Sequence, residues 1–100
     1  MSEPVRLGVI GCGRVTERLY LPAFGRLSNA RVVAVADRSQ ERRDFVSSRL
    51  RGCRAYASAE ALLDQALVEG VIIATPPETH IALAEAALLA HQQVARPHIA

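Results

Sequence analysis

The chain of 100 residues carries a formal net charge of +2, and half of its residues are hydrophobic. This length suits a single domain, and this composition excludes a disordered chain. All twelve basic residues are arginines scattered along the chain, which excludes chemistry that needs a lysine amine and argues against a nucleic-acid partner.

The first predicted elements alternate between strand and helix. Val5–Ile10 is a short apolar run that ends in glycine, as expected for a buried strand. Arg14–Leu27 has apolar residues at helical spacing, and Pro22 is expected to bend or shorten this helix. Arg31–Ala36 is almost continuously apolar, which is typical of a parallel strand covered on both faces. The apolar residues at helical spacing are Val15, Leu19, Phe24 and Leu27.

Two capped helices and a weak strand are predicted in the middle of the chain. Ser39 is expected to cap a polar helix that ends at about Leu50, with Phe45, Val46 and Leu50 turned inward. Residues 53–56 form a weak strand. Ser58 is expected to cap a short helix that ends near Ala66.

The last predicted elements complete a repeated alternation of strand and helix. Residues 70–75 form the clearest strand of the second half. Thr75 and Glu78 have the spacing of a capping box, so a helix is expected from there to about Ala90, followed by a fifth strand over 92–95. This order predicts the α/β class, with a Rossmann-type, doubly wound parallel sheet of about five strands.

The loop after the first strand resembles a dinucleotide fingerprint. Gly11 allows a tight turn out of the strand, and Gly13 lets the backbone approach a pyrophosphate. Thr16 stands where the fingerprint has a third glycine or an alanine, which weakens the match. Because the loop follows a strand and opens a helix, whose first N–H groups attract phosphate, we predict a cradle for a dinucleotide.

The acid at the end of the second strand supports this prediction. A carboxylate at the position of Asp37 accepts hydrogen bonds from the adenosine ribose hydroxyls. The alternative role for Asp37 is that of a turn or helix-capping acid ahead of Ser39. Its charge favours NAD, whereas the neighbouring Arg38 keeps NADP open because it could pair with a 2′-phosphate. Cys12, within the loop, is interpreted as a small residue without a redox role.

The sequence also argues against a membrane-spanning segment, a disulfide framework and a metal site. No apolar run reaches the roughly 18–20 residues that a bilayer-spanning helix requires, so no membrane partner is expected. Cys12 and Cys53 are too few for a disulfide framework, which favours a reduced, cytoplasmic protein. The three histidines have no ligand spacing with cysteines or carboxylates, so no metal site is predicted.

Three stretches together resemble one family: GVIGCGRVTERLYLPAF, VVAVADRS and VIIATPPETHIALAEAALLA. They are similar to the N-terminal domain of the glucose–fructose oxidoreductase, inositol dehydrogenase and rhizopine catabolism family (Gfo/Idh/MocA), over residues 5 to about 94. The third stretch is the most specific of the three. The resemblance implies that this domain binds NAD or NADP and that the family oxidises or reduces a carbon–oxygen bond of a sugar, polyol or related small molecule.

The resemblance also implies where the cofactor lies. Asp37 would contact the ribose, and Thr75, Pro76 and His80 would lie near the nicotinamide half. His80 is equally well interpreted as an exposed residue in the first turn of a helix. The residues assigned to the pyrophosphate are Gly11, Gly13, Arg14 and Val15.

The chain departs from the family pattern over Val94–Pro97, where the family has a strand ending in Glu-Lys-Pro. By the resemblance, that lysine polarises the substrate oxygen or transfers a proton. Here Ala95 and Arg96 stand at the glutamate and lysine positions. Arginine keeps the charge but cannot exchange a proton near neutral pH, so no catalytic residue is predicted in this chain.

Residues 1–100 are therefore expected to be one dinucleotide-binding domain, a truncated or fragmentary member of the family. We expect it to lack the sixth strand and the second α+β domain, and to show no dehydrogenase turnover alone, since hydride transfer requires a substrate held in place.

Two other hypotheses remain open. One is a non-enzymatic NAD(P)-binding or partner-binding module that self-associates through the exposed edge of its fifth strand. The other is a small α/β domain such as a methyltransferase core, which also places glycines after the first strand and an acid after the second. The segment TPPETH argues against the methyltransferase.

Overall fold

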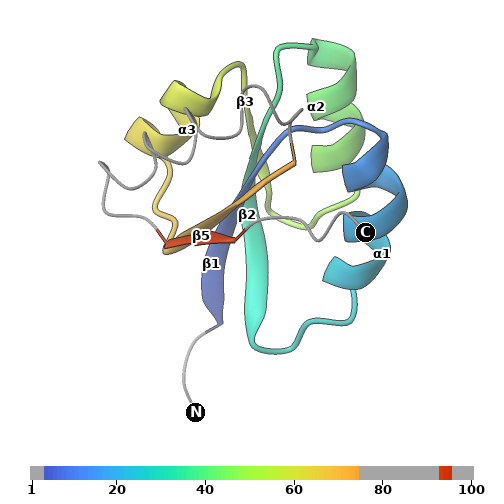
Figure 1. The fold of residues 1–100 in the computed structure, drawn as a ribbon, viewed down its shortest axis with the longest axis vertical. Helices are drawn as coiled ribbons and strands as arrows, with labels where there is room; N and C mark the ends of the chain where they lie inside the picture. The colour runs from blue at the N-terminus through green and yellow to red at the C-terminus, as the bar shows by residue number, and fades with distance from the viewer. Residues whose placement is uncertain (1–3, 75–92, 96–100) are drawn as a thin grey trace.

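The computed structural model describes residues 4–74 and 93–95 (Figure 1). The elements are β1 (Val5–Ile10), η1 (Thr16–Tyr20), α1 (Leu21–Phe24), β2 (Ala30–Ala36), α2 (Gln40–Ser47), β3 (Arg54–Tyr56), α3 (Ala59–Gln65), β4 (Gly70–Ile73) and β5 (Gln93–Ala95). From β1 to β4, strands and helices alternate along the chain, as the sequence predicts.

The five strands form one parallel sheet in the order β3-β2-β1-β4-β5. From β1 the chain builds outward through β2 to β3, then returns to place β4 on the other side of β1. The strand order therefore reverses between β1 and β4, and an open α/β sheet binds ligands at the carboxyl ends of its strands beside such a reversal. The predicted doubly wound Rossmann-type sheet is confirmed.

Helices cover both faces of the sheet (Figure 1). On one face, Ile10, Val71 and Ile73 pack with Leu62 of α3. On the other face, Val9 and Val35 belong to a second cluster, against which side chains of α1 and α2 pack. Successive strand residues alternate between these two clusters, because neighbouring side chains of a strand point to opposite faces. This explains why the strands are apolar almost without interruption.

The helix predicted over Arg14–Leu27 is shorter and less regular than expected. Its central part, η1, is a π-helical turn in which the N–H of Leu21 donates to the carbonyl of Thr16, and the helix ends at Phe24. The wide turn lies directly before Pro22, which has no N–H to donate and whose ring crowds the preceding turn. The proline therefore changes the form of the turn instead of breaking the helix.

The π-helical turn also changes which apolar residues face the sheet. One extra residue in a turn rotates all later side chains by about 100° around the axis. Leu19, which has regular helical spacing and lies within the wide turn, is 62% exposed. Phe24, which is one of the predicted apolar residues, packs against the core cluster of Val9 and Val35, and so does Leu21, which is not one of them.

The two serine caps are confirmed. Ser39 Oγ accepts from the N–H of Arg42 at 3.2 Å, and Ser58 Oγ accepts from the N–H of Ala61 at 3.1 Å. α2 ends at Ser47, earlier than predicted, because the N–H of Leu50 bonds to the carbonyl of Ser47, three residues back, which tightens the chain into a turn.

Of the strand predicted over residues 70–75, β4 covers Gly70–Ile73, and Ala74 follows it outside the strand. The helix predicted from Thr75 to Ala90 lies outside the described residues. Within the described ranges, no helix is both long and apolar enough to cross a membrane.

Candidate functional site: the glycine loop and the end of β2

The glycine loop leaves β1 at the carboxyl edge of the sheet. Gly11 has a φ of 108°, which side chains rarely tolerate, and its N–H donates to the carbonyl of Ala36 at 2.8 Å. Gly13 is exposed, and a Cβ placed on it would meet no described atom within 4 Å. The backbone at Gly13 therefore borders open space into which a phosphate could fit closely.

The helix that follows begins at this open space. The carbonyl of Gly13 accepts the first helical bond, from the N–H of Glu17 at 3.0 Å. The N–H groups of Arg14, Val15 and Thr16 precede that bond and have no acceptor within the helix. Arg14 and Val15 are exposed. The residues predicted to line a pyrophosphate thus stand together at a helix start, where the backbone dipole favours an anion.

Thr16, the departure from the glycine fingerprint, is fully buried. Its hydroxyl donates a hydrogen bond to the carbonyl of Gly11. This bond satisfies both the buried hydroxyl and the carbonyl of a residue that makes a sharp turn. Thr16 therefore serves as a brace across the loop, a role that a glycine or an alanine in its place could not have.

Asp37 faces the glycine loop from the end of β2. Its Oδ2 accepts from the N–H of Cys12 at 2.8 Å, and its Oδ1 accepts from the N–H of Ser39 at 2.9 Å. The bond to Ser39 is that of a turn acid, which is the alternative role of Asp37. The same position also leaves Asp37 beside the glycine loop, as the proposed ribose contact requires. A carboxylate has about four acceptor positions, and the half-buried Asp37 uses two of them in these bonds. Acceptor positions therefore remain for ribose hydroxyls.

Arg42 was not singled out from the sequence, yet it contacts the loop directly. From the first turn of α2, its Nε donates to the carbonyl of Cys12 at 2.8 Å. Its Nη2 donates to Glu17 Oε1, also at 2.8 Å. No local pattern marks Arg42, because its partners lie 30 and 25 residues away in the chain.

Cys12 is enclosed by these contacts. Its side chain is fully buried, and its Sγ lies 3.6 Å from the carbonyl of Ala36. Burial, and then the nearby charge of Asp37, raise the pKa of the Cys12 thiol to about 12. Since the thiolate is the nucleophile, this thiol is unreactive near neutral pH, in agreement with its interpretation as a packing residue.

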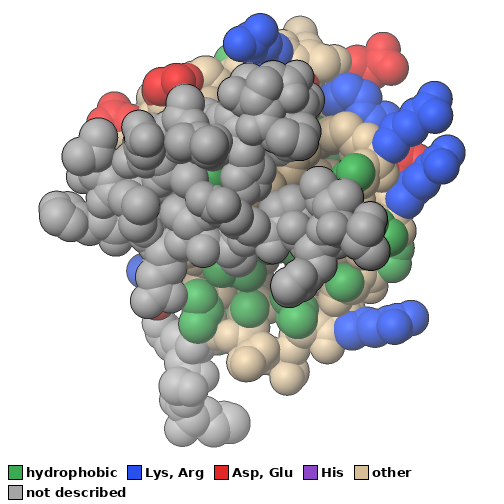
Figure 2. Space-filling view, in the orientation of Figure 1, with side chains coloured by type: hydrophobic (Ala, Val, Ile, Leu, Met, Phe, Trp, Pro, Cys, Tyr) green, Lys and Arg blue, Asp and Glu red, His purple; other side chains and the backbone are tan. Residues whose placement is uncertain are grey.

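The arginines near the end of β2 differ in what they contact. Arg43 Nη1 donates to the backbone carbonyls of Asp37 and Arg38, at 3.2 and 3.1 Å. Arg38 is exposed beside Asp37. Figure 2 shows basic side chains along the margin of the molecule that carries α1 and α2 in Figure 1.

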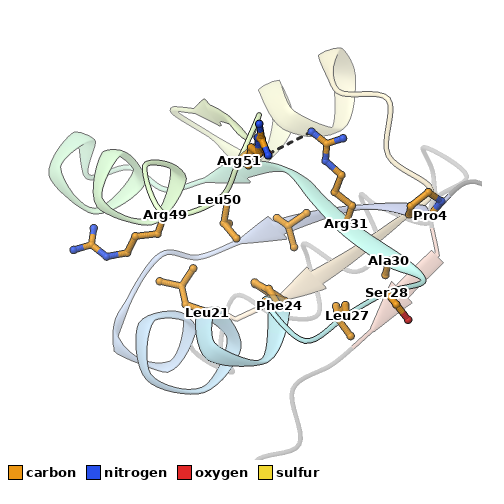
Figure 3. A pocket seen from close by; sticks show the side chains of 12 residues that line it. Pro4, Leu21, Phe24, Leu27, Ser28, Ala30, Arg31, Arg49, Leu50 and Arg51 are labelled. Carbon is orange, nitrogen blue, oxygen red and sulfur yellow. Dashed lines mark hydrogen bonds between the residues drawn. The ribbon is translucent and has the colours of Figure 1, made fainter.

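A pocket of about 370 Å³ lies at the opposite, amino edge of the sheet (Figure 3). Leu21 and Phe24 of α1 line it together with Val32, in the first half of β2, and Leu50. It is separate from the glycine loop, which leaves the carboxyl end of β1. Among residues 4–74 and 93–95, no three histidine, cysteine or acidic side chains gather into a group that could hold a metal ion.

The structure brings Gly11, Gly13 and Asp37 together at the carboxyl edge of β1 and β2. Thr75, Pro76 and His80, predicted near the nicotinamide, lie outside the described residues, and so does Arg96. Ala74, the residue that follows β4, donates its N–H to the carbonyl of Ile10 at 2.8 Å. β4 thus ends beside the start of the glycine loop.

Comparisons with known proteins agree with this geometry. The family model of the Gfo/Idh/MocA oxidoreductases, NAD-binding Rossmann fold, matches residues 5–96. A UDP-N-acetylglucosamine 3-dehydrogenase from Acidithiobacillus ferrooxidans is 40% identical over 86 residues, which are 86% of this chain and 26% of that protein. An inositol 2-dehydrogenase from Saccharopolyspora erythraea is 32% identical over 90 residues, 90% of this chain and 26% of that protein.

Solved structures share the fold. A 3-ketoreductase from Actinomadura kijaniata, in complex with NADP and TDP-benzene, has a TM-score of 0.87 and 31% identity, covering 94% of this chain and 29% of that one. The WlbA dehydrogenase from Bordetella pertussis, in complex with NADH and UDP-GlcNAcA, has a TM-score of 0.88 at 24% identity, covering 96% and 28%.

The chain spans about a quarter of the length of the curated relatives that it matches. Within that span, the glycine loop, the acid after β2 and the reversal of strand order all occur in this chain. Together with the match over residues 5–96, they show that the chain belongs to the Gfo/Idh/MocA oxidoreductase family, as its NAD-binding Rossmann domain.

Proposed function

We propose that the glycine loop and Asp37 hold the adenosine and pyrophosphate half of NAD. The observation that carries this proposal is the hydrogen bond from the N–H of Cys12 to Asp37. It fixes the carboxylate beside the loop, next to the open space at Gly13. A ribose needs an acidic acceptor, and the phosphate that follows it needs a backbone without a side chain close by. Asp37 supplies the first and Gly13 the second.

Each loop residue has a distinct task in this proposal. Gly13 gives the pyrophosphate room, and the N–H groups of Arg14 and Val15 donate to its oxygens. Thr16 keeps the loop in shape through its bond to Gly11. Thr75, Pro76 and His80 are proposed to contact the nicotinamide half, on the strength of the family resemblance.

Charge at the end of β2 favours NAD over NADP. Asp37 directs a carboxylate toward the ribose position, and a 2′-phosphate there would meet its negative charge. Arg38 is the residue that could offset this repulsion, since it is exposed and adjacent. Tight NADP binding would therefore depend on Arg38, whereas NAD binding would not.

For the protein as a whole we propose oxidation or reduction of a carbon–oxygen bond in a sugar, polyol or sugar nucleotide. The support is the family match and the names of the relatives, which include sugar-nucleotide and inositol dehydrogenases. Bound nicotinamide supplies the hydride acceptor or donor. This chain's residues bind and orient that cofactor, and Arg96 is proposed to hold a charge without exchanging protons.

Calorimetric titration of the chain with NAD, NADP and S-adenosyl methionine tests the proposal. Gly13→Val is the informative variant, because its side chain would enter open space and disturb no described contact. We expect Gly13→Val to keep its melting temperature and to lose NAD affinity by more than about tenfold. Gly25→Ala is the matched control, since its Cβ would meet only the carbonyl of Pro22, at 3.8 Å.

Two results would contradict this function. One is the absence of NAD and NADP binding by the wild-type chain. The other is unchanged NAD affinity in Gly13→Val, which would place the cofactor elsewhere. Binding of S-adenosyl methionine in place of both nucleotides would be a case of the first result.

Two further expectations stay predictions. β5 stands at the end of the described strand order, and self-association through this edge is tested by size exclusion with light scattering. A clean monomer would count against it. The cytoplasm is the compartment we propose, tested by fractionation of the source cells.

A further inference from the structure

Arg42 contacts the glycine loop without belonging to it, and its geometry suggests a role in cofactor binding. We propose that Arg42 is a positioning residue for the dinucleotide, acting through the carbonyl of Cys12. The inference rests on the proposed function, since it concerns the same loop. It adds a residue of α2 that neither the fingerprint nor the expected contacts to NAD include.

Three contacts hold Arg42 in place. Its backbone N–H donates to Ser39 Oγ at 3.2 Å, which fixes the start of α2. Its Nε donates to the carbonyl of Cys12, and its Nη2 donates to Glu17 Oε1, both at 2.8 Å. One guanidinium thus links α2 to the loop and to the helix that follows the loop. A planar group with several N–H donors can make such a link, and an ammonium group cannot reproduce its fork geometry.

The contact matters because of where Cys12 lies. It is the residue between Gly11 and Gly13, and glycines leave the chain on either side of it free to rotate. The N–H of Cys12 donates to Asp37, and the carbonyl of Cys12 accepts from Arg42, so both backbone polar groups of Cys12 are fixed. The loop therefore has its binding shape before NAD arrives, and the free energy of ordering it does not oppose binding.

Arg49 is a control that distinguishes a role of Arg42 in NAD binding from a purely structural role. Arg42 lies over the ring of Phe45, 4.9 Å from its centroid, so it also packs on α2. Arg49 lies over the same ring at 3.6 Å, and its Nη1 donates to the carbonyl of Phe45 rather than to the loop. Arg42 and Arg49 share the charge and the aromatic partner, and only Arg42 of the two contacts Cys12 and Glu17.

The experiment compares Arg42→Gln with Arg49→Gln in the full chain. NAD affinity is measured by calorimetry, and amide hydrogen exchange of the loop is measured by NMR without NAD. We expect Arg42→Gln to bind NAD about tenfold more weakly than Arg49→Gln, because a charge-assisted hydrogen bond is lost. We also expect faster exchange at Cys12 and Gly13 in Arg42→Gln alone, with the amides of α2 unchanged.

The outcomes separate the two proposals. If the wild-type chain binds neither NAD nor NADP, the proposed function fails and this inference fails with it. If the wild type binds NAD, and Arg42→Gln matches Arg49→Gln in affinity and in loop exchange, only the role of Arg42 is overturned. Should Arg42→Gln not fold, Arg42→Lys is compared with Arg49→Lys. Equal NAD affinity in that pair would overturn the role in the same way.

Discussion

Asp37 and Cys12 are joined by a hydrogen bond of 2.8 Å, from the backbone N–H of Cys12 to the carboxylate Oδ2. This bond links the carboxyl ends of β1 and β2, so Asp37 supports the fold as well as the proposed ribose contact. We expect Asp37→Ala to lower the free energy of unfolding by about 1–3 kcal/mol, because two backbone N–H groups lose a charged acceptor. Urea unfolding measures this change, and calorimetry measures the accompanying loss of NAD affinity.

The control for Asp37→Ala is Asp44→Ala, an exposed acid on α2. It removes the same charge, and we expect less than about 0.5 kcal/mol of change in unfolding and no change in NAD affinity. Equal effects of the two substitutions would show that net charge, and not the bond to Cys12, accounts for the result.

Thr16→Val tests the brace across the glycine loop. Valine keeps the shape of the buried side chain but cannot donate to the carbonyl of Gly11. We expect a loss of about 1–2 kcal/mol in the free energy of unfolding, because the carbonyl is left without its partner. Thr16→Ser keeps the hydroxyl and is the matched variant in the same urea titration. If Thr16→Val unfolds at the same urea concentration as the wild type, the hydroxyl has no stabilising role.

Much of this site could be predicted from the sequence because the signals are local. The apolar run of β2 ends at Asp37, which predicts an acid at the carboxyl end of that strand. Two closely spaced glycines directly after the apolar run of β1 predict the loop. Arg42 could not be predicted in this way, since its bond to Cys12 depends on how α2 packs beside the loop. The exposure of Leu19 also could not be predicted, because the π-helical turn before Pro22 changes the helical period that its spacing assumes.

Gly52→Ala tests a second turn, between α2 and β3. Gly52 has a φ of 70°, and an added Cβ would lie 2.5 Å from Arg31 Nη2. We expect a loss of about 1–2 kcal/mol in the free energy of unfolding, chiefly because a side chain disfavours this backbone conformation. Arg31 Nη2 also donates to the carbonyl of Arg51 at 3.3 Å, so the side chain has to move.

The double variant Arg31→Ala with Gly52→Ala separates those two causes. If backbone conformation dominates, adding Gly52→Ala to Arg31→Ala lowers unfolding free energy nearly as much as it does in the wild type. If the double variant instead has the same free energy of unfolding as Arg31→Ala alone, the clash with Arg31 accounts for the whole loss.

Cysteine alkylation tests how well the loop encloses Cys12. Burial raises the pKa of Cys53 to about 11, and the pKa of Cys12 to about 12, from an ordinary value of 9.0. Near neutral pH the folded chain should therefore react with iodoacetamide much more slowly at both cysteines than the urea-unfolded chain does, and most slowly at the fully buried Cys12. Mass spectrometry of the two sites gives the order. Faster labelling at Cys12 than at Cys53 would contradict the enclosed loop.

The raised pKa of Cys12 also predicts how stability changes with pH. Above pH 9.0 the unfolded chain releases the thiol proton, while the folded chain keeps it until about pH 12. The folded state then binds more protons than the unfolded state, so the free energy of unfolding falls as pH rises through this window. One thiol contributes a slope of up to about 1.4 kcal/mol per pH unit. Urea titrations between about pH 8 and pH 10 measure the fall. Cys12→Ala removes the titrating group and should show a shallower slope, and an equal slope in that variant would show that the Cys12 thiol is not its source.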